Sequence, residues 1–363
     1  MLKVAHSITD VEKDFFSVCP LLTLGSWNYY LALEKSQSLS LQNGWNPQYI
    51  TYYVDNKRAG FIPAFSRTSS GDDFSYDMEI SKAFTTETQK EYYPKMQVCI
   101  PFMPNEGTKF YFAESFEFNK KVFLKELTDW AKNEKVSSLH ITLPDASEYG
   151  LFEEAGFTSS EQSLCYWQNK NYASFSDFLG DLKSKYRSQI SQERKTVKQG
   201  GYTSECITSA TITKQHVDTF YDLFEQTHQR RDWIMSKLTR EFFHLFTASN
   251  PDQIVFFFTK KNGNTVASSC HFLETNMLCG RFWGSTHDEH FLHFEVMYYL
   301  PIEFCIQQQI ASMEIGFEKQ HKVIRGFVPK TVKTFHYFFD AGFQSKLNDF
   351  IPHKKFTDKK IFK

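Results

Sequence analysis

Residues 318–327, EKQHKVIRGF, place a histidine among basic side chains directly after an apolar run. A neutral imidazole is the natural proton acceptor near pH 7, so His321 is a candidate catalytic base. Lys322 and Arg325 would supply fixed positive charge for an oxyanion, a substrate carboxylate or a phosphate, and we class them as substrate-binding candidates. A basic turn that faces water is the alternative. The apolar residues interleaved in this stretch favour one wall of a reaction site.

A second stretch with candidate catalytic groups is LHFE, at the start of a predicted helix. His293 and Glu295 are the candidates here, with Glu295 as the rival or the partner of His321. A carboxylate in a first helical turn is favoured by the helix dipole by about 0.3–1 kcal/mol, so a structural glutamate is the alternative. The preceding HDEH could hold a metal ion, but ligands from one loop are a weak signal, and we predict no metal site.

Two further pairs are candidates for contact with a substrate. Arg281 and Trp283, in GRFWG, alternate on a predicted strand and therefore point to the same face. They could line a cleft together, or the arginine could stack on a core tryptophan. Tyr76 and Asp77, in SYDME, lie in a predicted loop, where an aspartate is most often a turn former.

Residues 171–201 form a predicted basic helix that would link two domains. Four cations recur in it at intervals of 4, 7 and 4, which places them on one helix face: Lys183, Arg187, Arg194 and Lys198. Only three acidic residues accompany them. A solvated face is the usual interpretation of such a pattern. The alternative is a site for an anionic donor: CoA, the phosphopantetheine arm of a carrier protein, or the acceptor end of a tRNA.

The elements that must position these residues belong to a chain of 363 residues, a length typical of two domains. Its hydrophobic and charged fractions, 41% and 23%, are those of a globular protein. A net charge of −1 gives no global field for DNA or an anionic membrane. The seven cysteines lack the spacing of a zinc site or a disulfide framework, which indicates reduced thiols and a cytoplasmic protein. The polar start of the chain predicts no signal peptide, and its apolar runs are too short to span a membrane.

Both halves of the sequence predict the element order α-α-β-β-β-α-β-α-β, which indicates a tandem duplication. In the first half we expect helices at 10–19 and 25–36 and a long irregular segment at 66–91. In the second half we expect a helix near 329–341 and a last strand near 343–350.

Each half closes on Ala-Gly-Phe, at 155–157 and 341–343, where the glycine would end a helix and the phenylalanine would begin the last strand. We therefore divide the chain into an N-terminal domain at 1–170, the basic linking helix at 171–201 and a C-terminal domain at 202–363. The second domain would carry the active site.

Several stretches resemble those of a known family: NGWNPQYI, SYDMEI, LCYWQNKNYASFSDFL, SKYRSQISQERKTV, GRFWG, LHFEVMYY and HKVIRGFVP. Their order and spacing resemble the FemAB-like predicted N-acyltransferases, which are related to the Fem-type aminoacyl and peptidyl transferases of bacterial cell-wall synthesis. The element order, with LFEEAGF, resembles the acetyltransferase fold called GNAT. The resemblance implies an α/β (α+β) fold of two tandem GNAT-like domains, each a mixed central sheet flanked by helices. It also favours the catalytic interpretation of LHFE.

In a GNAT-like domain the fourth and fifth strands splay apart, and the reacting carbonyl lies in the gap. In the second half these strands are expected at 277–285 and 312–317, so the stretches that hold His293 and His321 would form the rim of the site. One residue departs from the family pattern, because Gln320 stands where the family has an acid.

GNAT enzymes bind the CoA pyrophosphate with a glycine-rich turn, and the corresponding turn here, STHDEHFLHFE, has no glycine and three acids. This favours an acyl carrier protein or an aminoacyl-tRNA over acyl-CoA as the donor, and no tightly bound cofactor is expected. We expect an N-acyltransferase that moves an acyl or aminoacyl group from a thioester or aminoacyl-tRNA donor to a small-molecule or peptide amine by direct attack. The alternative is a non-catalytic module that recognises a peptide, a cell-wall fragment or a carrier protein.

Overall fold

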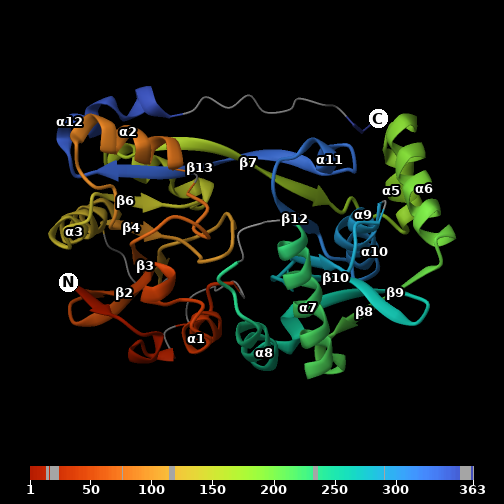
Figure 1. Ribbon diagram of the computed structural model, residues 1–363. Helices are drawn as coiled ribbons and strands as arrows, with labels where there is room; N and C mark the ends of the chain where they lie inside the picture. The colour runs from red at the N-terminus through yellow and green to blue at the C-terminus, as the bar shows by residue number, and fades with distance from the viewer. Residues whose placement is uncertain are drawn as a thin grey trace. The chain divides into compact units, whose positions relative to one another are not determined.

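The computed structural model describes residues 1–13, 16, 24–75, 77–113, 119–231, 236–289, 291–351 and 361–362. It comprises two compact units: unit 1 is Met1–Gln162 with Thr331–Lys355, and unit 2 is Ser163–Lys330 with Phe356–Lys363. Each unit is a mixed β-sheet with helices packed on it (Figure 1). The predicted α/β fold with mixed central sheets is therefore confirmed.

The sheet of unit 1 has the strand order β1 (Leu2–Ala5), β2 (Trp45–Val54), β3 (Lys57–Arg67), β4 (Lys95–Val98), β6 (Ser138–Ile141) and β13 (Val328–Phe338). The short β5 (Tyr111–Phe112) also pairs with β3. Neighbouring strands are antiparallel except β4 and β6, which are parallel.

The sheet of unit 2 follows the same plan, in the order β8 (Tyr202–Thr208), β9 (Ile254–Lys261), β10 (Asn264–Leu273), β11 (Met277–Ser285), β12 (Ser312–Phe317) and β7 (Thr158–Gln168). Here the parallel pair is β11 and β12, and the other neighbours are antiparallel. The two strands predicted to flank the site, 277–285 and 312–317, are β11 and β12 residue for residue.

The two halves of the chain exchange their last strands. Residues 331–338 of β13 belong to unit 1, where β13 pairs with β6. Residues 163–168 of β7 belong to unit 2, where β7 pairs with β12. The units therefore differ from the domains expected with boundaries at residues 170 and 201. The reason is that β13, from the end of the second half, completes the sheet of unit 1, and β7, from the end of the first half, completes the sheet of unit 2.

The described helices of unit 1 are α1 (Trp27–Lys35), α2 (Met78–Thr88), α3 (Lys120–Asn133), α4 (Tyr149–Glu154) and α12 (Ala341–Lys346). The helix expected at 25–36 is confirmed as α1, whereas half of the one expected at 10–19 lies outside the described residues. The prediction of an irregular segment at 66–91 is wrong for residues 78–88, which form α2. α2 forms there because Ile80 and Phe84 lie one turn apart and give the helix a buried apolar face.

The end of the chain also differs from the prediction. The segment expected as a helix near 329–341 is β13, and the segment expected as a strand near 343–350 is α12 followed by the 3-10 turn Leu347–Phe350. Asp340 caps α12 by accepting from the N–H of Phe343, so Gly342 lies inside the helix and does not end it. The Ala-Gly-Phe at 155–157 behaves as expected, with φ +82° at its glycine.

The described helices of unit 2 are α5 (Phe175–Asp181), α6 (Ser184–Gln199), α7 (Lys214–Arg230), α8 (Arg240–Ser249), α9 (Leu292–Phe294), α10 (Leu300–Gln307) and α11 (Gln320–Val323). A π-helical turn, Glu295–Tyr299, joins α9 to α10. α7 packs so closely on β11 that a Cβ added to Gly284 would lie 2.1 Å from the carbonyl carbon of Leu223. The close approach therefore requires glycine at this position. Among the described residues, no helix is long and apolar enough to cross a membrane.

The exchanged strand predicts that unit 1 is incomplete without residues 331–355. We expect a fragment of residues 1–162 to lack a cooperative thermal transition, because the edge of β6 and its buried side chains would have no partner. Co-expression with a peptide of residues 331–355 should restore the transition, measured by circular dichroism. A cooperative transition of the fragment alone would contradict this expectation.

Candidate functional site

The parallel strands of unit 2 part where the site was expected. β11 and β12 stay in register from Met277 opposite Ser312 to Cys279 opposite Glu314. β11 then continues to Ser285 beside β10, while β12 shifts register against β7 beyond Glu314. Gly316, with φ +77°, allows this change of direction.

A buried ion pair lies at the point where the strands part. The guanidinium of Arg281 pairs with the carboxylate of Glu314, and their side chains are 4% and 1% exposed. Glu314 also accepts from the backbone N–H of Gly316. Arg281 was predicted to bind substrate next to Trp283, but its charge is neutralised within the protein. The pair connects β11 and β12 at the point where the strands part.

The side chain of Lys322 binds backbone carbonyl groups at the end of β12. Its Nζ donates to the carbonyl oxygens of Ile315 at 2.5 Å and Phe317 at 2.8 Å. Burial lowers the pKa of Lys322 to about 8. An ammonium group has three N–H donors, so these two bonds leave one N–H of Lys322 for a further acceptor.

His321 lies in α11, next to this lysine, and its ring is half-buried. Its Nε2 lies 3.1 Å from the hydroxyl of Tyr298, and the two rings are nearly parallel, at 19°. Burial, followed by the charges of Lys322 and Arg325, lowers the pKa of His321 to about 4. The imidazole is therefore neutral at pH 7.

His293 joins the same group of rings. Its ring centroid lies 4.5 Å from that of Trp283, 5.3 Å from that of Tyr298 and 6.3 Å from that of His321. Burial, and next the proximity of His321, lowers the pKa of His293 to about 3. We call Trp283, His293, Phe294, Tyr298 and His321 the imidazole cluster. It connects β11 to α11 beyond the point where the strands part.

Arg325 lies beneath this cluster, contacts two of its residues, His321 and Phe294, and is only 3% exposed. Its Nη2 and Nε donate to the two carboxylate oxygens of Glu193, on α6, at 2.6 and 3.0 Å. Its Nη1 donates to the backbone carbonyl of His321 at 2.7 Å, and its guanidinium lies 3.4 Å from the ring centroid of Phe294. Arg325 was predicted to bind substrate, but its charge is paired with Glu193 inside the protein.

Glu295 does not partner His321. Its carboxylate accepts from Arg194, with Nη2 at 2.9 Å, and Arg194 also pairs with Glu303 at 2.9 Å. Burial raises the pKa of Glu295, and the charge of Arg194 opposes that rise. Because Arg194 is held by two carboxylates, the cationic face predicted on α6 is reduced to side chains that are exposed or half-buried, namely Lys183, Arg187 and Lys198.

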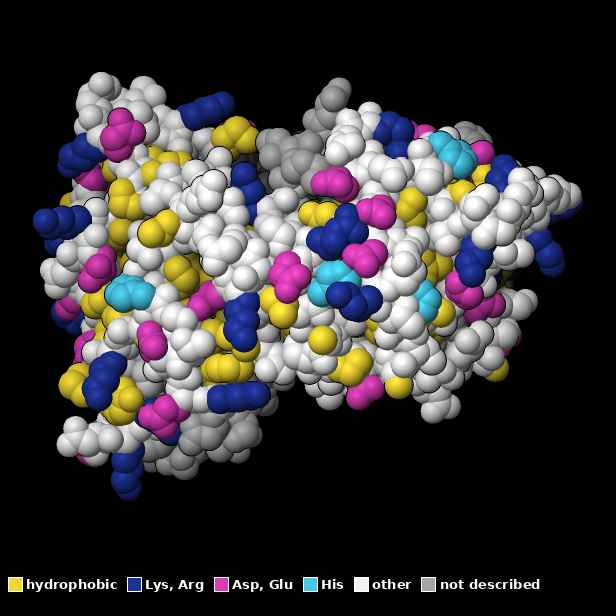
Figure 2. Space-filling view, turned by 60° about the horizontal axis from the view of Figure 1, so that its bottom comes forward, with side chains coloured by type: hydrophobic (Ala, Val, Ile, Leu, Met, Phe, Trp, Pro, Cys, Tyr) yellow, Lys and Arg dark blue, Asp and Glu magenta, His cyan; other side chains and the backbone are white. Residues whose placement is uncertain are grey.

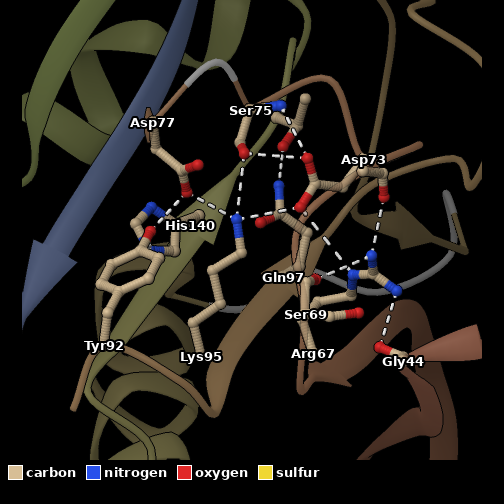
Figure 3. A network of polar contacts seen from close by, with 12 residues as sticks. Gly44, Arg67, Ser69, Asp73, Ser75, Asp77, Tyr92, Lys95, Gln97 and His140 are labelled. Atoms are coloured by element: carbon tan, nitrogen blue, oxygen red, sulfur yellow. Dashed lines mark hydrogen bonds and ion pairs between the residues drawn. The ribbon is translucent and has the colours of Figure 1, made fainter. Parts of the chain in front are cut away.

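Asp77 lies in a different place, a buried polar network of unit 1 (Figure 3). Its carboxylate accepts from Lys95 Nζ at 2.5 Å and from the hydroxyl of Tyr92. Burial alone would raise the pKa of Asp77, but the charge of Lys95 outweighs it and lowers the pKa. Lys95 also pairs with Asp73 at 2.9 Å. Tyr76, the neighbour of Asp77 in the prediction, lies outside the described residues.

A chain of hydrogen bonds continues from this network across the sheet. Tyr92 lies 3.2 Å from His140 Nε2, and His140 Nδ1 lies 2.7 Å from His336 Nδ1. His336 Nε2 in turn lies 2.8 Å from the hydroxyl of Ser160. These residues come from β6, β7, β13 and the segment before β4, and they are buried. Sequence reasoning missed them, because only strand pairing brings His140 opposite His336.

The two units have the same strand order. In unit 2 the parallel strands β11 and β12 part, and histidines lie beside the gap. This arrangement is that of a tandem GNAT-type protein, the class predicted from the sequence. The chain belongs to the FemAB-like family, whose model, described as peptidoglycan biosynthesis/recognition, matches residues 7–362. No curated protein matches the sequence.

Solved structures with the same fold include FemX, at 11% identity and TM-score 0.57, over 95% of this chain and 100% of that one. A conserved protein of unknown function from Bacteroides thetaiotaomicron is similar at 11% identity and TM-score 0.57, over 93% and 99%. L-PGS from Bacillus licheniformis is similar at 10% identity and TM-score 0.53, over 88% and 94%. At such identities the likeness concerns the fold alone.

The pair at the parted strands predicts a large stability effect. Arg281→Met would leave Glu314 buried without its cation, and we expect the free energy of unfolding to fall by about 3–5 kcal/mol, measured in urea. The double variant Arg281→Met, Glu314→Met should recover part of this loss, because no charge then remains buried. A loss below about 1 kcal/mol in the single variant would mean that water reaches the pair.

The histidines of unit 1 predict acid sensitivity. Burial lowers the pKa of His336 from its ordinary 6.5 to about 4, so the unfolded chain binds the proton more readily than the folded chain. The resulting stability is fully present above pH 6.5 and is lost as the pH falls towards 4, by on the order of 3 kcal/mol. His336→Gln, which cannot titrate, should flatten the fall of the urea midpoint between pH 6.5 and 4.5. An unchanged slope would contradict the assignment of this loss to His336.

Proposed function

We propose that this protein is a transferase that joins an acyl or aminoacyl group to an amine at the parted strands of unit 2. The observation that carries the proposal is the pairing of two groups at this point. A neutral, half-buried imidazole, His321, lies next to an ammonium, Lys322, that has one N–H group left to donate. Acyl transfer needs both a group that handles protons and a donor for the charge that develops on the carbonyl oxygen.

The reaction would be a direct attack of the amine on the carbonyl carbon of the donor. A C–N bond forms, and the C–S or C–O bond of the thioester or ester breaks. One proton passes from nitrogen to the leaving sulfur or oxygen. The ammonium of Lys322 would stabilise the oxyanion, and Trp283 and His293 would line the approach of the substrate. Glu295 has a smaller part than the sequence implied, because it holds Arg194.

The charge pattern and the family support one class of acceptor and two classes of donor. The description peptidoglycan biosynthesis/recognition supports a peptide or small-molecule amine of the cell wall as acceptor. On the face drawn in Figure 2, basic and acidic side chains are interspersed, so an anionic donor would need a local site. Lys183, directly before α6, and Arg187 and Lys198 on α6 are the candidates for it, and an aminoacyl-tRNA or acyl carrier protein fits them better than acyl-CoA.

A binding module without catalysis is the second candidate. One observation favours it, namely that Glu295 pairs with Arg194 and not with His321. Gln320, at a position where the resemblance to the family implies an acid, points the same way. Such a module would recognise a peptide, a cell-wall fragment or a carrier protein with the imidazole cluster.

Turnover and binding measured on one preparation distinguish the two. The protein is incubated with acetyl-CoA, long-chain acyl-CoA, acyl carrier protein or aminoacyl-tRNA and with peptide amines, and the products are read by mass spectrometry. A thermal shift with each donor reports binding, since a ligand of the folded state raises the midpoint. We expect one donor class to be used, and His321→Ala to lower kcat/KM by about 10²–10³-fold while the thermal shift persists.

His6→Ala is the matched control, because His6 is an exposed histidine of unit 1, and its turnover should equal that of the unaltered protein. A thermal shift without turnover would support the binding module. No shift and no turnover with any donor would overturn the proposal.

A further inference from the structure

We propose that Tyr298 donates its hydroxyl proton to Nε2 of His321 and thereby fixes the ring in the Nδ1–H tautomer. The imidazole would then present an N–H donor to the substrate carbonyl instead of a base to the amine. This assignment of the proton rests on geometry. Its catalytic consequence rests on the proposed function, and it changes the role given there to His321 from a group that handles protons to a second hydrogen-bond donor for the carbonyl oxygen.

The first argument concerns the proton of Tyr298. The side chain is 2% exposed, so its hydroxyl has little access to water and needs a partner inside the protein. Among the described residues, the partner of this hydroxyl is Nε2 of His321, at 3.1 Å. A phenol is a good donor and a weak acceptor, and a neutral imidazole has one unprotonated nitrogen that accepts strongly. The bond is therefore satisfied when the hydroxyl donates.

The second argument concerns the charge of the ring. Lys319, Lys322 and Arg325 face His321 from its own segment, and Tyr298 and His293 face it from the π-helical turn and α9. All the charged groups in this set are cations. A protonated ring would be repelled by them, so the ring carries one proton only. With Nε2 accepting from Tyr298, that proton lies on Nδ1.

The third argument concerns how firmly the ring is held. Arg325 Nη1 binds the backbone carbonyl of His321, and Glu193 on α6 holds Arg325. Lys322, the next residue, is tied to the end of β12. The π-helical turn places two consecutive tyrosines on two polar partners, since Tyr298 reaches His321 and Tyr299 reaches Glu193. The backbone of His321 is thus held by Arg325 and by the neighbouring Lys322. Tyr298 is the residue that positions the imidazole ring itself.

The chemistry of such a ring differs from that of a base. The Nδ1–H group of His321 and the remaining N–H of Lys322 would both donate to the oxygen of the reacting carbonyl. The amine proton would then leave with the departing sulfur or oxygen, and His321 would end the step with the proton that it had at the start. A neutral imidazole serves as a donor in this way over the whole range above its pKa.

The experiment is nitrogen NMR of the full-length protein labelled with ¹⁵N-histidine, which reports the tautomer and titration of each ring. The signals of His321 are assigned by their loss in His321→Gln. We expect the Nδ1–H tautomer at pH 7.5. In Tyr298→Phe the donor to the neutral ring is gone, so the midpoint of His321 should rise and the Nε2–H tautomer should become populated.

An Nε2–H tautomer in the unaltered protein, or a midpoint that falls in Tyr298→Phe, would overturn the proposal. Tyr202→Phe is the control, because it removes a hydroxyl that binds Lys261 and lies outside the network around His321, and it should leave the tautomer of His321 unchanged. Where a donor supports turnover, Tyr298→Phe should lower kcat about tenfold with little change in KM. If no donor is turned over, the NMR result still tests the tautomer, so the failure of one proposal is separable from the failure of the other.

Discussion

The buried pair between Glu193 and Arg325 is the interaction on which the architecture of unit 2 depends. Their side chains are each 3% exposed, and a charge so far from water is tolerated only beside an opposite charge with its hydrogen bonds satisfied. The pair joins α6, the π-helical turn and α11, three elements that are distant in the sequence. Removing either partner would leave the other as an uncompensated charge. The position of His321 follows from this requirement, since the arginine that satisfies Glu193 also holds the histidine backbone.

The two units place different side chains at equivalent strands. In unit 2 the parallel strands part after Cys279 and Glu314, and the half-buried imidazole cluster lies beyond. In unit 1 the parallel strands remain joined, because the N–H of Thr142 donates to the carbonyl of Val98 at 2.9 Å. The network of Asp77, Lys95 and His140 fills this part of unit 1 with closed hydrogen bonds. This contrast supports placing the chemistry in unit 2, while the polar groups of unit 1 stabilise its sheet.

The sequence predicted the elements that local patterns determine. β11 and β12 were placed to the residue, because apolar runs and flanking turns mark both ends of each strand. β13 and α12 were interchanged, since an apolar run near the end of a chain fits either period until its neighbours are known. The residues predicted to line a site in the second half do lie around the parted strands, but several of their charges are paired inside the protein. Arg281, Arg325 and Arg194 look like exposed cations in a sequence, and their carboxylate partners lie up to 132 residues away, where no spacing rule connects them. Tyr298 carried no signal beyond that of a core aromatic.

The exchange of β7 and β13 has a consequence for how the protein is made. A ribosome releases the chain from its N-terminus, and ordinary domains fold as they emerge. We expect unit 1 to fold later than this, because its last strand is synthesised only after residues 163–330 of unit 2. Before β13 is synthesised, His140 lacks its hydrogen-bond partner His336, and the edge of β6 is unpaired. The nascent protein would therefore hold a sheet that lacks its last strand while residues 163–330 are synthesised. In that state, pairing of the open edge with another chain competes with the pairing of β6 and β13.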